Sequence, residues 1–144
     1  IFTQIEKKAR WSVGQAEVGE IDEMNILKAT HRAMKRALKT LLASHPAIVP
    51  DVVLVDGLPV PDMGYPQQSI VKGDAKSASI AAASIVAKVS RDRMMHELDR
   101  EFPQYGFAKH KGYGTRRHRE NLFKWGPSPV HRKSFAPVAE AGSR

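Results

Sequence analysis

Residues 52–57 read Val-Val-Leu-Val-Asp-Gly, and residues 72–77 read Lys-Gly-Asp-Ala-Lys-Ser. The first stretch is a short apolar run that ends in an acid, which is typical of a strand covered on both faces. The second stretch precedes an alanine-rich helical pattern. Because ligands of open α/β sheets bind beyond the carboxyl ends of the strands, these stretches predict an α/β fold with Asp56 and Asp74 at one site.

Further elements are expected on both sides of these stretches. Residues 10–18 alternate apolar and polar positions like a strand, and residues 20–43 have the three- and four-residue apolar spacing of one amphipathic helix. The remaining expected elements are the end of a helix at 1–9, a strand at 67–72, a helix at 75–101, a loop at 104–115, a helix at 116–125 and a loose tail from residue 136.

The length of 144 residues, 42% of them hydrophobic, suits one domain with a buried core. We expect residues 1–102 to form the catalytic core and residues 103–144 to form a basic loop and helix region packed on it. The chain has no cysteine, which excludes disulfides and thiolate metal sites, and it has no apolar run long enough to span a bilayer. We therefore expect a cytoplasmic protein without a membrane partner.

The net charge of +8 is concentrated in one part of the chain. Residues 103–133 contain eight lysines and arginines and one acid, and aromatic residues are interleaved among them. Such a block fits a surface that contacts nucleic-acid phosphates and stacks on bases or sugars. The alternative at this level is a solvated face that only keeps the protein soluble.

The two acids have both a chemical and a structural interpretation. Neighbouring carboxylates repel each other unless a cation or a proton lies between them, and Mg²⁺ and Mn²⁺ prefer oxygen ligands. Two such ions about 4 Å apart can hydrolyse a phosphodiester, although that site usually needs three or four carboxylates. Asp56 followed by glycine is equally typical of a turn, and Asp74 could cap the following helix.

The remaining polar residues are interpreted as surface, helix-start or isolated groups, and two lysines have an alternative role as phosphate contacts. Lys72 and Lys76 flank Asp74 and are either surface lysines or phosphate contacts. The acids near the first long helix are interpreted as helix-start acids rather than metal ligands; they are Glu17, Glu20, Asp22 and Glu23. The histidines show no zinc-binding spacing, and those at positions 110, 118 and 131 are expected to lie apart.

Several stretches in one order carry a resemblance to a known family. They are Asn-Ile-Leu at 25–27, Val-Leu-Val-Asp-Gly at 53–57, Val-Lys-Gly-Asp-Ala-Lys-Ser at 71–77, Ile-Ala-Ala-Ala-Ser-Ile at 80–85, Tyr-Gly-Phe-Ala-Lys-His-Lys-Gly-Tyr-Gly-Thr at 105–115 and His-Arg-Lys-Ser-Phe at 131–135. Together they resemble the bacterial ribonuclease HII family, the type 2 ribonucleases H.

This resemblance implies a ribonuclease H-like fold, with a mixed sheet, flanking helices and a helical C-terminal extension. It implies an endoribonuclease that uses Mn²⁺ or Mg²⁺, and no small-molecule cofactor, to cut RNA–DNA hybrids and single ribonucleotides in DNA duplexes, with a role in DNA repair. It implies 3′-hydroxyl and 5′-phosphate products. The residues implied are metal ligands at Asp56 and Asp74 and a sugar-stacking Tyr113. Beside these, we expect nucleic-acid contacts at Lys72, Lys76, Lys109, His110, Lys111 and Arg116.

One part of the family pattern has no match. The family's opening strand carries Asp-Glu followed by Ala-Gly-Arg-Gly, and residues 1–20 contain no such stretch. We therefore expect a chain that lacks the N-terminal part of the sheet and two metal-binding carboxylates, and that does not cleave by itself. The alternatives are a basic domain that binds duplex or hybrid nucleic acid without hydrolysis, another metal nuclease of the same general fold, and a fragment with no stable function.

Overall fold

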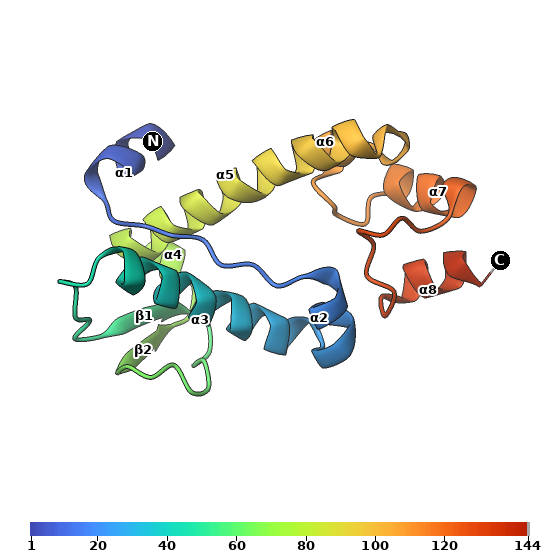
Figure 1. The fold of residues 1–144 in the computed structure, drawn as a ribbon. Coiled ribbons are helices and arrows are strands. Elements are labelled where there is room, and N and C mark those ends of the chain that lie inside the picture. Colours follow the sequence, from blue (N-terminus) through green and yellow to red (C-terminus); the bar gives the residue numbers. More distant parts are fainter. Residues whose placement is uncertain (144) are drawn as a thin grey trace. The chain divides into compact units, whose positions relative to one another are not determined.

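The structure is a computed structural model that describes residues 1–143 (Figure 1). It forms two compact units, one made of Ile1–Gln15 and Thr30–Val89 and the other of Ala16–Ala29 and Ser90–Arg144. The elements are α1 (Phe2–Lys8), α2 (Val18–Met24), α3 (Ile26–Ser44), β1 (Val53–Asp56), β2 (Gln67–Ile70), α4 (Gly73–Lys76), α5 (Ala78–Glu101), a 3-10 helix η1 (Pro103–Tyr105), α6 (Phe107–His110), α7 (Arg116–Trp125) and α8 (Ala136–Gly142).

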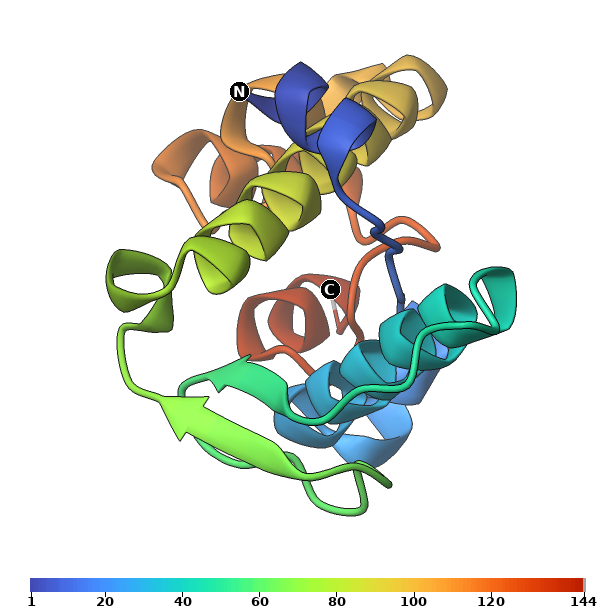
Figure 2. The same ribbon diagram turned by 90° about the vertical axis from the view of Figure 1, so that its left-hand side faces the viewer.

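The sheet within residues 1–143 is a parallel pair, β1 and β2, which run side by side in Figure 2. Val53 is paired with Gln67 and Asp56 with Ile70, so both strands end at the same edge. The predicted α/β class is confirmed, and so are two of the three predicted strands, the one that ends at Asp56 and the one expected at 67–72. Val52 is 47% exposed, however, so the expectation that this run is covered on both faces is wrong within the described residues.

A side chain fixes the connection between the two strands. Val60 is fully buried, and its backbone N–H donates to Gln67 Oε1 at 2.9 Å while its carbonyl accepts from Gln67 Nε2 at 2.8 Å. A buried backbone group without a partner is costly, and one amide side chain here satisfies two of them. Gln67 therefore holds the loop against the start of β2.

Replacing Gln67 by alanine is expected to lower the free energy of unfolding by about 2 kcal/mol, because both backbone groups of Val60 lose their partner. Chemical denaturation monitored by circular dichroism measures this change. Gln68→Ala is the matched control, since the neighbouring side chain is exposed and should change stability by less than about 0.5 kcal/mol. Equal losses for the two variants would contradict the role given to Gln67.

The segment predicted as a strand at 10–18 is irregular up to residue 17. It lies along α3 instead, where the Ser12 hydroxyl donates to the Ala37 carbonyl and Arg36 Nη1 donates to the Gln15 carbonyl at 2.8 Å. Gly14 approaches the α3 backbone so closely that a Cβ there would overlap the Ala33 carbonyl. The alternating pattern therefore comes from packing on a helix and not from pairing with a strand.

The single helix expected at 20–43 is interrupted at Asn25, which has a φ of 80°. Its N–H donates to the Ile21 carbonyl at 3.0 Å and so ends α2, while its Oδ1 accepts from the Lys28 N–H at 3.0 Å at the start of α3. Asparagine adopts positive φ more readily than most residues and is a good N-cap. One residue thus separates the two helices, and the prediction of a continuous helix was wrong.

The C-terminal region contains two small apolar clusters. Met95, Tyr105 and Phe107 form the first, and Leu122 of α7 packs with Val138 and Ala141 of α8 in the second. The loose tail predicted from residue 136 is therefore wrong, because α8 buries two side chains up to residue 141. The loop expected at 104–115 also contains α6 and the end of η1.

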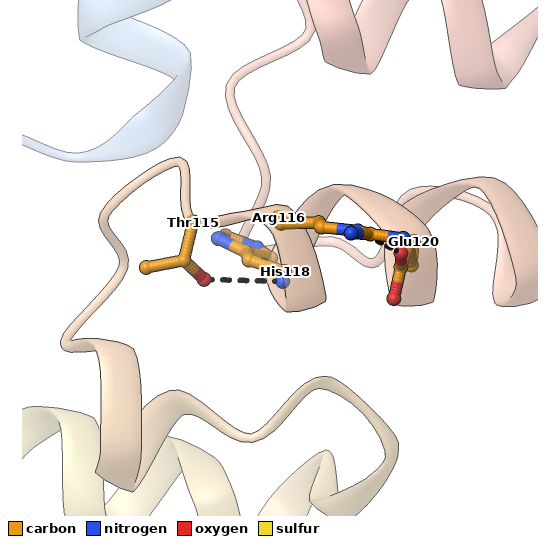
Figure 3. Close-up of polar contacts among 4 residues, drawn as sticks. All are labelled: Thr115, Arg116, His118 and Glu120. Carbon is orange, nitrogen blue, oxygen red and sulfur yellow. Dashed lines mark hydrogen bonds and ion pairs between the residues drawn. The ribbon is translucent and has the colours of Figure 1, made fainter.

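Helix α7 begins and ends where the sequence predicted. Its N-cap is Thr115, whose Oγ1 accepts from the His118 N–H at 3.2 Å, as Figure 3 shows. Gly126 follows the helix with a φ of 76°, a conformation that suits glycine after a helix end. Within residues 1–143, no helix combines the length and apolar character that crossing a bilayer requires.

Candidate functional site

Asp56 is the last residue of β1, and its side chain is exposed. Its Oδ1 accepts a hydrogen bond from the Gly73 N–H at 2.9 Å. Gly57, with a φ of 93°, turns the chain away and donates to the Ile70 carbonyl at 3.0 Å. Asp56 therefore both precedes a turn and presents a carboxylate to the segment that carries Asp74.

Asp74 lies in the first turn of α4, and its carboxylate is exposed. The N-cap of that short helix is Lys72, with a φ of 54°, so the prediction that Asp74 caps a helix was wrong. A Cβ at Gly73 would lie 2.6 Å from Ile80 Cδ1 and 3.4 Å from Asp56 Oδ1. A side chain at Gly73 would therefore require the Ile80 side chain to shift, whereas its contact with Asp56 would be an ordinary van der Waals contact.

These two acids offer oxygen atoms of the kind that hard divalent cations bind. One Asp56 oxygen accepts an amide N–H, and Asp74 makes no hydrogen bond with any residue from 1 to 143. The exposed lysines Lys72 and Lys76 flank Asp74. In this described part of the chain, no group of three or more histidines, aspartates and glutamates is arranged so that it could hold a metal ion.

The acids near α2 have structural partners. Glu17 and Glu20 form a reciprocal capping box at the start of α2, with the Glu17 N–H donating to Glu20 Oε2 at 2.8 Å. Asp22 accepts from the backbone N–H groups of Lys133 and Ser134, at 3.0 and 2.9 Å, and from the Ser134 hydroxyl at 2.6 Å. The hydrogen bonds from Ser134 lower the pKa of Asp22. Sequence reasoning missed this contact, since nothing local indicates a partner so far along the chain.

Tyr113 is presented on the surface of its unit, with 68% of the residue exposed. Arg91 of α5 supports it, because Arg91 Nη2 donates to the Lys111 carbonyl at 3.1 Å and its guanidinium carbon lies 5.9 Å from the Tyr113 ring centroid. Gly112, between the two, has a φ of 82° and leaves room for this arginine, which a Cβ would approach to 3.0 Å. The loop is therefore shaped to expose an aromatic ring.

Basic residues surround this ring in the sequence and differ in their partners. Lys109 is exposed, Lys111 Nζ lies 3.1 Å from His96 Nε2, and Arg116 Nε donates to Glu120 Oε1 at 2.8 Å (Figure 3). Both side chains of the last pair are largely exposed, so it contributes little to stability. Trp125 is also exposed, and Lys124 Nζ lies 4.8 Å from its ring centroid. Basic side chains and exposed aromatic side chains therefore follow one another along residues 109–125 of this unit.

His110 is not on that surface. It is buried, its Nε2 lies 2.7 Å from the Tyr105 carbonyl, and its Nδ1 accepts from the Gly112 N–H at 3.1 Å. Both ring nitrogens are therefore used inside the protein, and His110 is a structural residue rather than a nucleic-acid contact. His118 and His131 are buried beside it, so the expectation that these three histidines lie apart was wrong.

The predicted site residues belong to different units. Asp56, Lys72, Asp74 and Lys76 lie in the first unit, and residues 109–116 lie in the second. Within the first unit, the structure brings the Asp56 carboxylate to the backbone next to Asp74. Within the second, it joins Tyr113 to Arg91, which the sequence analysis did not select.

Comparison with known proteins gives consistent matches. Residues 1–138 match the family model described as Ribonuclease HII. Proteins named Ribonuclease HII from two strains of Desulfitobacterium hafniense, DSM 10664 / DCB-2 and Y51, are each 54% identical over 141 residues, which is 97% of this chain and 52% of the relative. The chain therefore spans about half the length of these curated relatives.

A solved structure is also similar. It is described as the structure of the PCNA:RNase HII complex from Archaeoglobus fulgidus, and it matches with a TM-score of 0.57 and 25% identity over 82% of this chain and 62% of that one. The fold expected from the sequence is thus confirmed by a solved relative, and the two sets of comparisons agree with each other.

Proposed function

Because the chain belongs to the ribonuclease HII family, we propose that the protein is an endoribonuclease acting on RNA–DNA hybrids and on single ribonucleotides embedded in duplex DNA. Cleavage would leave 3′-hydroxyl and 5′-phosphate ends, and the biological role would be DNA repair in the cytoplasm. The observation that carries this proposal is the contact between the Asp56 carboxylate and the Gly73 amide, which brings the strand-end acid to the backbone next to Asp74.

Asp56 and Asp74 are the residues proposed to hold Mn²⁺ or Mg²⁺. When bound, a pair of such ions activates water and stabilises the leaving oxygen of a phosphodiester. The Gly73 N–H fixes one oxygen of Asp56, which orients the carboxylate before any ligand binds. Both acids are exposed, so nucleic acid can reach them. We propose that Lys72 and Lys76 contact phosphates beside these acids.

The second unit would supply further contacts. We propose that Lys109, Lys111 and Arg116 bind the phosphate backbone and that Tyr113 stacks on the sugar next to the cut. The exposure of the Tyr113 ring and its support by Arg91 favour this role. A stacking ring beside a ribonucleotide can help distinguish an RNA–DNA junction because its fit depends on the sugar it meets.

Replacing Tyr113 by alanine in the full-length gene product is expected to reduce cleavage at an embedded ribonucleotide by on the order of 10-fold or more, since base or sugar stacking contributes about 1–3 kcal/mol. Tyr113→Phe keeps the ring and should retain most of the activity. Steady-state cleavage of a labelled duplex containing one ribonucleotide measures both. Equal rates for the alanine variant and the parent would contradict the stacking role.

We also propose that residues 1–144 alone bind nucleic acid but do not cleave it, because two carboxylates are fewer than a two-ion site usually has. Incubating this chain and the full-length gene product with the same duplex and Mn²⁺ compares them directly. Cleavage by the isolated chain at the full-length rate would refute this statement and leave the family assignment unchanged.

A second candidate function is binding without hydrolysis, which the alternation of basic and exposed aromatic residues at 109–133 favours. Such a domain would need no metal, and its affinity would fall steeply as the salt concentration rises. A fluorescence anisotropy titration in EDTA, repeated at several salt concentrations, separates this function from catalysis when it is paired with the cleavage assay.

A further inference from the structure

Three buried histidine rings form a cluster in the second unit, and we refer to His110, His118 and His131 as the histidine cluster. The rings of His110 and His118 are stacked with centroids 4.0 Å apart and an interplanar angle of 10°. His118 Nε2 and His131 Nε2 are 3.1 Å apart, so one nitrogen must donate and the other accept. His118 and His131 are therefore joined by one N–H···N hydrogen bond, and His110 stacks on His118.

The partners of the other ring nitrogens determine which imidazole donates. His131 Nδ1 accepts from the Ser128 N–H at 3.0 Å, with the Ser128 hydroxyl at 2.7 Å, so the proton of His131 is on Nε2. His118 Nδ1 is 2.9 Å from the Tyr113 carbonyl, which can only accept, so the proton of His118 is on Nδ1. His131 therefore donates to His118, and His118 donates to Tyr113.

This arrangement has no acceptor for a second proton on His118, because its Nε2–H would point at the Nε2–H of His131. A second proton on His131 would oppose the Ser128 N–H, and the Ser128 hydroxyl at 2.7 Å is the acceptor that could take it. The titratable groups facing this pair are His110, stacked on His118, and Tyr105, whose ring centroid is 4.8 Å from that of His131. Neither imidazole forms an ion pair with a carboxylate from residues 1–143.

The pKa values agree with this geometry. Burial, followed by the neighbouring His118, lowers the pKa of His131 to about 4. Burial also lowers the pKa of His118, with a further decrease from His110. Because folded-state pKa values below the ordinary 6.5 mean that the unfolded chain binds more protons, stability contributed by the pair is lost as pH falls from about 6.5 towards about 4.

Through His118, the pair of His118 and His131 is hydrogen-bonded to the loop at residues 113–115, which carries Tyr113. His118 donates to the Tyr113 carbonyl, and the His118 backbone N–H donates to Thr115 Oγ1 at 3.2 Å (Figure 3). The Tyr113 ring itself is exposed and contacts Arg91. The backbone of this loop is thus fixed from inside the unit, while the side chain remains available to a ligand.

From this geometry we propose that His118 and His131 are positioning residues: as a neutral hydrogen-bonded pair they hold the Tyr113 backbone, and Tyr113 is displaced when His118 is protonated. A role of this histidine pair in substrate binding rests on the proposed function, in which Tyr113 stacks on the substrate. The structural coupling between the histidine pair and Tyr113 does not depend on it.

The chain has three tyrosines, so labelling with 3-fluorotyrosine gives three ¹⁹F signals that tyrosine-to-phenylalanine variants assign. We expect the Tyr113 signal to change between about pH 7 and about pH 4 with the same midpoint as the imidazole signals of His118 and His131. Tyr65, in the other unit, should show no such change. A Tyr113 signal that stays constant while the imidazoles titrate, or that changes only when the far-UV circular dichroism is lost, overturns the proposal.

Three variants separate positioning from packing. In H131Q the amide can donate to or accept from His118, so no pair of N–H groups conflicts and the Tyr113 signal should become independent of pH. In H118N the amide keeps a donor near the Tyr113 carbonyl and should retain the parent signal at pH 7, whereas H118L should not. A parent-like pH response in H131Q, or equal signals in H118N and H118L, refutes the coupling.

The cleavage assay is kept separate from these measurements, which need no nucleic acid. If the full-length gene product cleaves, H118L should raise KM more than it lowers kcat, and H118N should restore KM towards the parent value. If the gene product does not cleave any ribonucleotide substrate, the proposed function fails, while the ¹⁹F titration still decides whether the histidine pair positions Tyr113.

Discussion

Replacing Asp56 by asparagine is expected to abolish cleavage of a duplex with one embedded ribonucleotide, by on the order of 10³-fold, when tested in the full-length gene product with Mn²⁺. Asparagine has the same shape and can still accept from the Gly73 N–H through its oxygen. What it lacks is the negative charge that a divalent ion needs. The loss should therefore appear in the rate of cleavage and not in folding.

Binding distinguishes this result from a damaged protein. The variant should bind the same duplex within a few-fold of the parent, because most of the affinity comes from cationic residues contacting phosphates. Asp51→Asn is the matched control, since Asp51 is an exposed acid just before β1. Turnover that survives in Asp56→Asn, or that falls equally in the control, would rule out Asp56 as a metal ligand.

Replacing Gly14 by alanine is expected to cause the largest loss of stability among glycine-to-alanine changes at the described glycines. The added Cβ would overlap the Ala33 carbonyl oxygen and lie 2.5 Å from the Ala37 nitrogen, and both are backbone atoms of α3. Helix backbone cannot rotate away as a side chain can, so the segment at 10–17 must separate from the helix. We expect a loss of about 3 kcal/mol or more in the free energy of unfolding.

Gly19→Ala is the matched control for this prediction. Gly19 is exposed in α2, and no atom lies within 4 Å of a Cβ placed there. Alanine favours helix by about 1 kcal/mol over glycine, so this variant should be as stable as the parent or more so. Thermal unfolding of both variants provides the measurement. If Gly14→Ala melts at the same temperature as the parent, the segment at 10–17 does not pack closely against α3 in solution.

The sequence predicted those elements whose local signals agree with their surroundings. Helix α7 has a threonine cap at its start and a glycine after its end, and β1 lies in a short apolar run that a glycine follows. It failed where distant packing decided the structure. The alternation at residues 10–18 is satisfied by α3, and the break at Asn25 interrupts an apolar pattern that otherwise continues. Asn25 belongs to a residue type that often caps helices, and this was the local signal that could have predicted the break.

Some of the geometry around the proposed site residues follows from the sequence. The position of Asp56 at a strand end follows from the apolar run before it, since parallel strands share their carboxyl edge. The N-cap role of Asp74 was wrong because the left-handed Lys72 starts the helix two residues earlier. Neither Arg91 beneath Tyr113 nor the meeting of His118 with His131 could be predicted, because their spacing has no helical or strand period.

The contact between Asp22 and Ser134 joins residues 112 positions apart, and both belong to the same unit. Closing so long a loop is entropically costly and slow compared with forming a helix. During translation, residue 22 leaves the ribosome long before residue 134 is synthesised. We therefore expect Asp22 of α2 to lack its hydrogen-bond partners until Ser134 has left the ribosome, and the second unit to reach its final form only after that point.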